Sequence, residues 1–142
     1  MLGLTALVTA AVIAFLPETL YFPVIEYTTP ENIGFKLLKN GELDRSGCER
    51  GAHAIAQAIV ASCPNCKVVE RCIRGLDAER RKILSRAPLP TPSIRTRDGK
   101  VAMTISAGDP QLALSVCRAS EQQGASKPLD QRPFCFPAFA DR

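Results

Sequence analysis

The chain has 142 residues, which suffices for one domain with a modest core but not for two independent ones. Eighteen Lys and Arg against fourteen Asp and Glu give a formal net charge of +4, well short of the basic balance of a nucleic-acid-binding protein. There is no Trp and there are only two Tyr, which leaves few aromatic faces for stacking on bases. We therefore expect no nucleic-acid partner.

The first 16 residues, MLGLTALVTAAVIAFL, contain no charged side chain. A membrane-spanning helix needs about 20 apolar residues, and the apolar stretch extends to Ile25 if two prolines and a glutamate are tolerated. A secretory signal peptide normally begins with basic residues, whereas the first basic side chain here is Lys36. Residues 1–25 are therefore predicted to form an uncleaved membrane-anchor helix, which makes the membrane one partner. A buried core helix is the alternative.

Two features give opposite predictions for the side of the membrane on which the domain lies. Lys36, Lys39 and Arg45 follow the apolar stretch and no basic residue precedes it, which favours a cytoplasmic domain. Six cysteines, an even number, are typical of a domain that folds in an oxidising compartment. Because acidic residues are interspersed with the basic ones, we give the cysteines more weight. The domain is therefore expected to lie outside the cytoplasmic membrane.

The domain is predicted to begin at Ser46, after a tether over residues 26–45. Ser46-Gly47-Cys48-Glu49 matches the capping box that starts a helix. This helix is expected to run to Ser62, before Pro64 stops it. Its buried stripe has the spacing of one helix face and consists of Cys48, Ala52, Ile55 and Ile59.

A β-prone stretch follows over residues 67–73, and Asp77 is then expected to cap a second helix over residues 78–86. The charged side of that helix is interpreted as a solvent-exposed face. Residues 87–92, with three prolines, form an extended connector.

A hairpin is predicted next, with strands at residues 93–97 and 101–106 around Asp98-Gly99, a dipeptide typical of a type I′ turn. Asp109 and Pro110 have the residue types of an N-cap and a first helical position, and the helix that they start is expected to end before Gly124.

These elements predict an α+β domain over residues 46–123, in the order helix-strand-helix-strand-strand-helix. Part of this order matches a ferredoxin-like sandwich. A closing strand at residues 132–139 would complete the sandwich, but its prolines would confine it to a sheet edge. Residues 124–142 are expected to be a proline-rich tail, ordered through Cys135. The sequence shows no internal repeat.

The cysteines are all disulfide candidates. Cys48 and Cys63 lie on one predicted helix, about 22 Å apart, so they cannot pair with each other. The favoured set joins Cys117 to Cys135. It also contains either Cys48–Cys72 or Cys48–Cys66, with Cys63 bonded to the remaining cysteine. Each such bond could stabilise the domain by about 2–4 kcal/mol.

Cys63-Pro64-Asn65-Cys66 has the C-x-x-C spacing of a thiol-disulfide redox site. A catalytic pair normally lies at a helix N-terminus, where the helix dipole stabilises the thiolate. Here the predicted helix ends at the first cysteine, so a membrane-tethered oxidoreductase using Cys63 and Cys66 is only the first alternative function.

A zinc module is the second alternative. Its four ligands would be Cys48, Cys63, Cys66 and Cys72, because a structural zinc site needs four and this part of the chain supplies four thiols. The single histidine, His53, is predicted to be solvated on a polar side of its helix. No motif requires a cofactor, and none indicates a catalytic residue.

Residues 46–120 resemble small membrane-anchored envelope proteins of proteobacteria that are associated with cell-surface polysaccharide gene clusters. The run SCPNC…RC…GLDAE, the DG hairpin and the DPQLALSVC helix carry this resemblance. It implies an inner-membrane protein with the soluble domain in the periplasm, and it transfers no site residue. The function expected from the whole sequence is a non-enzymatic envelope accessory protein with a disulfide-stabilised domain. It would have a protein partner and a link to surface polysaccharide assembly.

Overall fold

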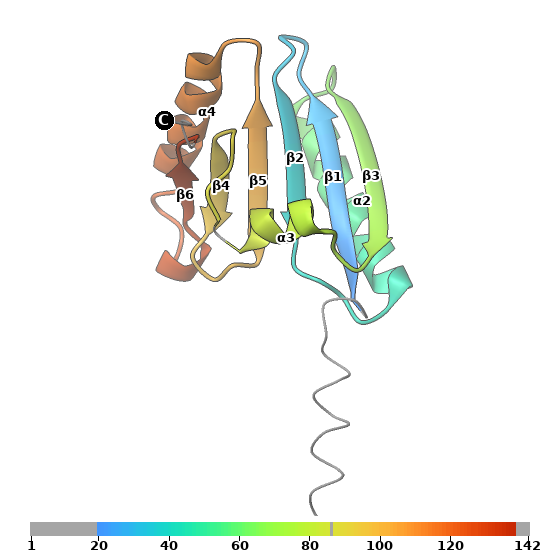
Figure 1. Ribbon diagram of the computed structural model, residues 1–142. Helices are drawn as coiled ribbons and strands as arrows, with labels where there is room; N and C mark the ends of the chain where they lie inside the picture. The colour runs from blue at the N-terminus through green and yellow to red at the C-terminus, as the bar shows by residue number, and fades with distance from the viewer. Residues whose placement is uncertain (1–19, 86, 139–142) are drawn as a thin grey trace, which may run out of the picture.

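A computed structural model describes residues 20–85 and 87–138 of the chain, which form an antiparallel sheet with helices on both faces (Figure 1). The strands are β1 (Tyr21–Thr28), β2 (Gly34–Lys39), β3 (Lys67–Arg74), β4 (Ser93–Thr96), β5 (Val101–Ser106) and β6 (Pro133–Phe136). The helices are α2 (Arg45–Ser62), α3 (Ala78–Leu84) and α4 (Pro110–Gln123), and a short 3-10 helix spans Leu129–Gln131.

The chain builds the same unit twice. Each unit has the order strand-strand-helix-strand: first β1, β2, α2 and β3, then β4, β5, α4 and β6. The six strands lie in the order β3-β1-β2-β5-β4-β6, so the first strand of each unit lies between its second and third. The two units meet where β2 pairs with β5. A structural repeat is therefore present although the sequence shows none.

The two faces of the sheet carry different helices (Figure 1). Face 1 contains the row Ile25, Leu37, Met103 and Ile94, and the two long helices lie on it: α2 packs on β1 and β3, and α4 packs on β4, β5 and β6. Face 2 contains the row Val24, Leu38 and Ala102, and α3 crosses it over β2 and β5.

Both faces contribute a core. On face 2, a cluster closes under α3 and the connector, and it contains Phe22, Val24, Leu38, Ile83, Leu89 and Ala102. On face 1, a second cluster lies under α4 and contains Ile94, Ile105, Ala113 and Cys117. Ile25 is fully buried on the same face, where α2 packs on β1. The sheet is therefore the middle layer of a structure with apolar contacts on both sides.

The expected order helix-strand-helix-strand-strand-helix is wrong, because the sheet begins 25 residues before the predicted start at Ser46. Residues 21–25, assigned to the anchor helix, lie in β1, and residues 26–45, expected to be a tether, supply the rest of β1 and all of β2. These strands lie between β3 and β5, so the ferredoxin-like sandwich is also wrong. Residues 1–19 of the predicted anchor lie outside the described residues. Within the described part of the chain, no helix combines the length and the apolar character needed to cross a membrane.

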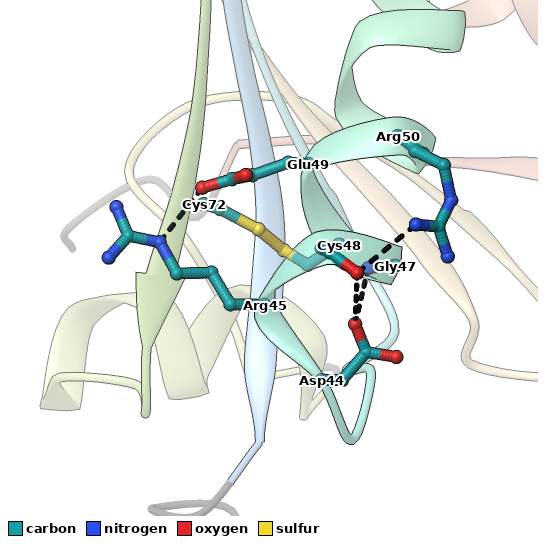
Figure 2. A network of polar contacts seen from close by, with 8 residues as sticks. Asp44, Arg45, Gly47, Cys48, Glu49, Arg50 and Cys72 are labelled. Atoms are coloured by element: carbon teal, nitrogen blue, oxygen red, sulfur yellow. Dashed lines mark hydrogen bonds and ion pairs between the residues drawn. A yellow bond between two sulfur atoms is a disulfide. The ribbon is translucent and has the colours of Figure 1, made fainter.

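The N-cap of α2 is Asp44, not Ser46 (Figure 2). The Asp44 carboxylate accepts a hydrogen bond from the Gly47 backbone N–H at 2.6 Å and another from the Ser46 hydroxyl at 2.8 Å. These bonds hold the pKa of Asp44 below its ordinary value, the Gly47 N–H having the larger effect. The predicted capping box fails because Glu49 instead accepts a hydrogen bond from Arg45, at 2.8 Å.

The hairpin forms where it is predicted, but its turn is of a different type. A type I′ turn needs positive φ at both central residues, whereas Gly99 (φ 72°) is positive and Asp98 is not. The Gly99 N–H instead donates to the Thr96 carbonyl at 3.1 Å. The Thr96 hydroxyl and then the Lys100 N–H donate to the Asp98 carboxylate and lower the pKa of Asp98. The four-residue loop therefore uses aspartate as a hydrogen-bond acceptor.

The N-cap assignment predicts a pH-dependent difference in stability. We expect Asp44→Ala to lower the midpoint of thermal unfolding at neutral pH, because it leaves the Gly47 N–H without its acceptor. Since the folded pKa of Asp44 is depressed, its charge stabilises the fold fully above the unfolded pKa of about 3.9, and that contribution is lost as the pH falls through the folded pKa. The difference between the variant and the wild type should therefore shrink in acid, as measured by circular dichroism. Ser46→Ala is the control, and a larger effect of Ser46→Ala at neutral pH would contradict this assignment.

Candidate functional site

The six cysteines form three disulfides: Cys48–Cys72, Cys63–Cys66 and Cys117–Cys135. Their Cα–Cα distances are 6.0, 5.4 and 5.3 Å, inside the range that a disulfide requires. The prediction of a disulfide-rich domain is confirmed. Of the two alternatives left open for Cys48, the bond to Cys72 is the one present.

Two of the disulfides occupy equivalent places in the two units. Cys48 joins α2 to Cys72 on β3, and Cys117 joins α4 to Cys135 on β6. In each unit the bond ties the helix to the outermost strand, on face 1 of the sheet. Cys48 and Cys117 are both fully buried. Figure 2 shows the first bond beside the N-cap of α2. These two disulfides therefore staple the two edges of the sheet to the helices.

The third disulfide, Cys63–Cys66, closes the turn between α2 and β3. Cys63 is the C-cap of α2, and its N–H donates to the Ile59 carbonyl at 2.8 Å. The negative end of the dipole of an 18-residue helix is therefore directed at this pair. This is the reverse of the arrangement that stabilises a reactive thiolate.

The four thiols proposed as zinc ligands are divided between two separate disulfides, Cys48–Cys72 and Cys63–Cys66. Within the described residues, no group of three or more His, Cys, Asp and Glu side chains could hold a metal ion. His53 is exposed as expected, but it is not merely solvated, because its Nδ1 lies 2.9 Å from a carboxylate oxygen of Glu70 on β3.

A groove of about 680 Å³ lies on face 2, beside α3 and the connector. Its floor consists of side chains from three adjacent strands. One row across β1, β2 and β5 is Glu26, Lys36 and Thr104, and the next row is Thr28, Gly34 and Ser106. Its walls come from α3 and the connector, and they include Glu79, Lys82, Ile83, Pro88, Leu89, Pro90 and Thr91. An antiparallel sheet often exposes a flat polar face to solvent. Here α3 and the connector rise above that face and enclose a groove.

The charged groups on the floor are not equivalent. The Glu26 carboxylate accepts a hydrogen bond from the Arg71 guanidinium on β3 at 2.7 Å. Lys36, its cross-strand neighbour, forms no ion pair with any of the residues that the structure describes. The floor therefore presents an ammonium group beside a carboxylate that already has a partner.

Gly34 keeps the floor of the groove low. A Cβ built at this position would lie 2.6 Å from the Ser106 hydroxyl oxygen, closer than real Cβ atoms approach other heavy atoms. That hydroxyl donates to the Gly34 carbonyl at 3.4 Å. The absence of a side chain at residue 34 therefore lets Ser106 lie across β2.

A second polar feature of face 2 is buried. The Arg95 side chain is 4% exposed, donates to the Ala87 carbonyl at 2.7 Å and lies 5.1 Å from the centre of the Phe136 ring. It thereby ties the connector to β4 and β6. We interpret Arg95 as structural.

Comparisons with protein families, with curated proteins and with solved structures found no match to this chain. Its function is therefore argued from the disulfides and the groove.

Sequence reasoning found the cysteines and missed the groove. The groove has no sequence motif, since its residues come from three strands, a helix and a connector. The one signal that could have indicated it is the alternation of residues in β1 and β2, which places Glu26 and Thr28 on the face opposite Ile25.

The loop lengths predict how much each disulfide stabilises the fold. Replacing both Cys48 and Cys72 by Ala should lower the free energy of unfolding by about 3 kcal/mol, because this bond closes a long loop of sequence separation 24. The same replacement of Cys63 and Cys66, whose separation is 3, should cost only about 2 kcal/mol. Guanidinium unfolding without reductant measures both values. A larger loss from the short loop would contradict this ranking.

The position of Cys63 at a helix C-terminus predicts that its free thiol is alkylated slowly. In a Cys66→Ala variant, the lone Cys63 thiol should react with iodoacetamide at neutral pH no faster than free glutathione does, because the helix dipole disfavours the thiolate. A Cys63→Ala variant, with the lone thiol at Cys66, is the matched control. A Cys63 rate about tenfold above that of glutathione would restore the oxidoreductase hypothesis.

Proposed function

We propose that the chain is a non-enzymatic binding module that works in an oxidising compartment outside the cytoplasm. The observation that carries this proposal is that all six cysteines are paired in three disulfides. Such use of cysteine is typical of secreted and periplasmic domains and rare in the cytosol.

The distribution of chemistry-bearing residues supports binding rather than catalysis. The single histidine lies beside Glu70 on α2 and β3, away from the groove on face 2. The groove presents two lysines, two carboxylates, one of them paired, and several hydroxyls, which suit recognition of a polar ligand. The Cys63–Cys66 disulfide closes a turn at the C-terminus of α2, where no helix N-terminus stabilises a thiolate. We therefore assign it a structural role.

The finer parts of the proposal are a periplasmic location, a protein partner in the envelope and a link to surface polysaccharide assembly. They rest on the resemblance of residues 46–120 to envelope proteins. The disulfides are compatible with this location because the bacterial periplasm is oxidising.

The compartment can be tested on the natively expressed full chain. We expect no thiol to be alkylated before reduction and six after it, as measured by intact mass. A Cys117→Ala variant, which frees Cys135, is the control that shows that the reagent reaches an unpaired thiol. Free thiols in the unreduced wild-type chain would contradict the proposal. Protease treatment of spheroplasts gives a second readout, because a domain that resists external protease would not be periplasmic.

A further inference from the structure

We propose that the groove on face 2 binds an acidic saccharide, that is, a sugar unit that carries a carboxylate. This inference deepens the proposed function, since it names the ligand class of the binding module. It rests on the charge, the hydroxyl groups and the shape of the groove.

The charge of the groove favours an anion. Lys36 on the floor and Lys82 on the wall supply two ammonium groups. Of the two carboxylates, Glu26 is paired at 2.7 Å with Arg71, a β3 residue outside the groove lining, and Glu79 lies beside Lys82 on α3, where both are exposed. Apart from the neutral Glu26–Arg71 pair, the lining therefore carries two ammonium groups against one carboxylate. A single carboxylate on the ligand would balance it.

The uncharged polar side chains that line the groove all carry hydroxyls. Thr28, Thr91, Thr104 and Ser106 line it from three strands and the connector. A hydroxyl can donate and accept a hydrogen bond at the same time, and the hydroxyls of a sugar have the same double capacity. A planar amide or an aromatic ligand would leave most of this capacity unused.

The shape of the groove suits an extended ligand with a low profile. Gly34 adds no side chain to the floor, and the small Ser106 side chain lies low across it. The rings of Pro88 and Pro90 on the wall offer apolar surface to the C–H groups of a sugar ring. The volume of about 680 Å³ falls within the range of about 300–1,000 Å³ typical of small-ligand sites.

The test is a titration of the ¹⁵N-labelled full chain with trigalacturonate, followed by NMR. We expect amide shift changes confined to residues 26–28, 34–36, 79–91 and 104–106. Lys36→Gln should weaken binding about tenfold, because a charge-assisted hydrogen bond is lost. Lys39→Gln is the matched control. It removes the same charge from the same strand, but Lys39 lies on face 1. The affinity of this variant for trigalacturonate should therefore be nearly unchanged.

Two further titrations separate the contribution of the ligand's carboxylate from that of its sugar ring. Maltotriose has a similar size and no carboxylate, and inorganic phosphate has the charge without the sugar. Both should bind much more weakly than trigalacturonate.

Several results would overturn the inference. These are no shift with trigalacturonate at millimolar concentration, equal shifts with maltotriose, equal binding of phosphate, or an equal loss in Lys36→Gln and Lys39→Gln. None of them would alter the thiol measurement, so the compartment proposal fails or survives separately.

Discussion

The antiparallel pairing of β2 with β5 is the contact on which the rest of the structure depends. It joins the two units through a register that runs from Gly34 opposite Ser106 to Lys39 opposite Val101. Because side chains alternate between faces, a slip of one residue would exchange the faces of one unit relative to the other. The face 2 cluster would then lose Ala102 from its place beside Leu38. The groove would lose Thr104 from its place beside Lys36.

The outer edges of the sheet are protected in two ways. Each edge strand is tied to its helix by a disulfide, and each strand also carries residues that oppose further pairing. The strand β3 contains four charged residues, and β6 is short and begins with Pro133. The repeat of one unit thus explains why both edges need a staple, since in each unit the third strand is outermost.

Much of the fold after residue 45 follows from local sequence signals. The predicted strand at 67–73, the Asp77 cap, the hairpin and the helix after Asp109 all occur within a few residues of their predicted places, because caps and turns act locally. The short strand β6 forms at an edge, as its prolines require. The helix α2 ends at Ser62 as predicted, but it begins at Arg45 because Asp44 replaces Ser46 as its cap.

The strands β1 and β2 were missed because β1 continues the uncharged N-terminal stretch. An apolar run cannot be divided between a helix and a buried strand by composition alone. Pro23 is also unfavourable in a strand with partners on both sides, because it lacks the N–H that a sheet hydrogen bond needs. In the structure, β1 pairs with β2 only from Val24 onward, so Pro23 pairs with β3 alone, opposite Cys72. The proline is therefore tolerated at the point where the strand has one neighbour.

The groove could not be predicted because it depends on register and not on any local segment. Lys36 and Thr104 are far apart in the sequence and become neighbours only through the β2–β5 pairing. A sheet that leaves part of one face polar buries less apolar surface than a fully covered sheet, and therefore gains less stability from it. Two disulfides that each contribute about 3 kcal/mol compensate for such a loss. Both lie on face 1, at the outer strands, so they stabilise the sheet without occupying the face on which a ligand would bind. The disulfides and the groove are in this sense complementary: the bonds on one face allow the other face to remain open.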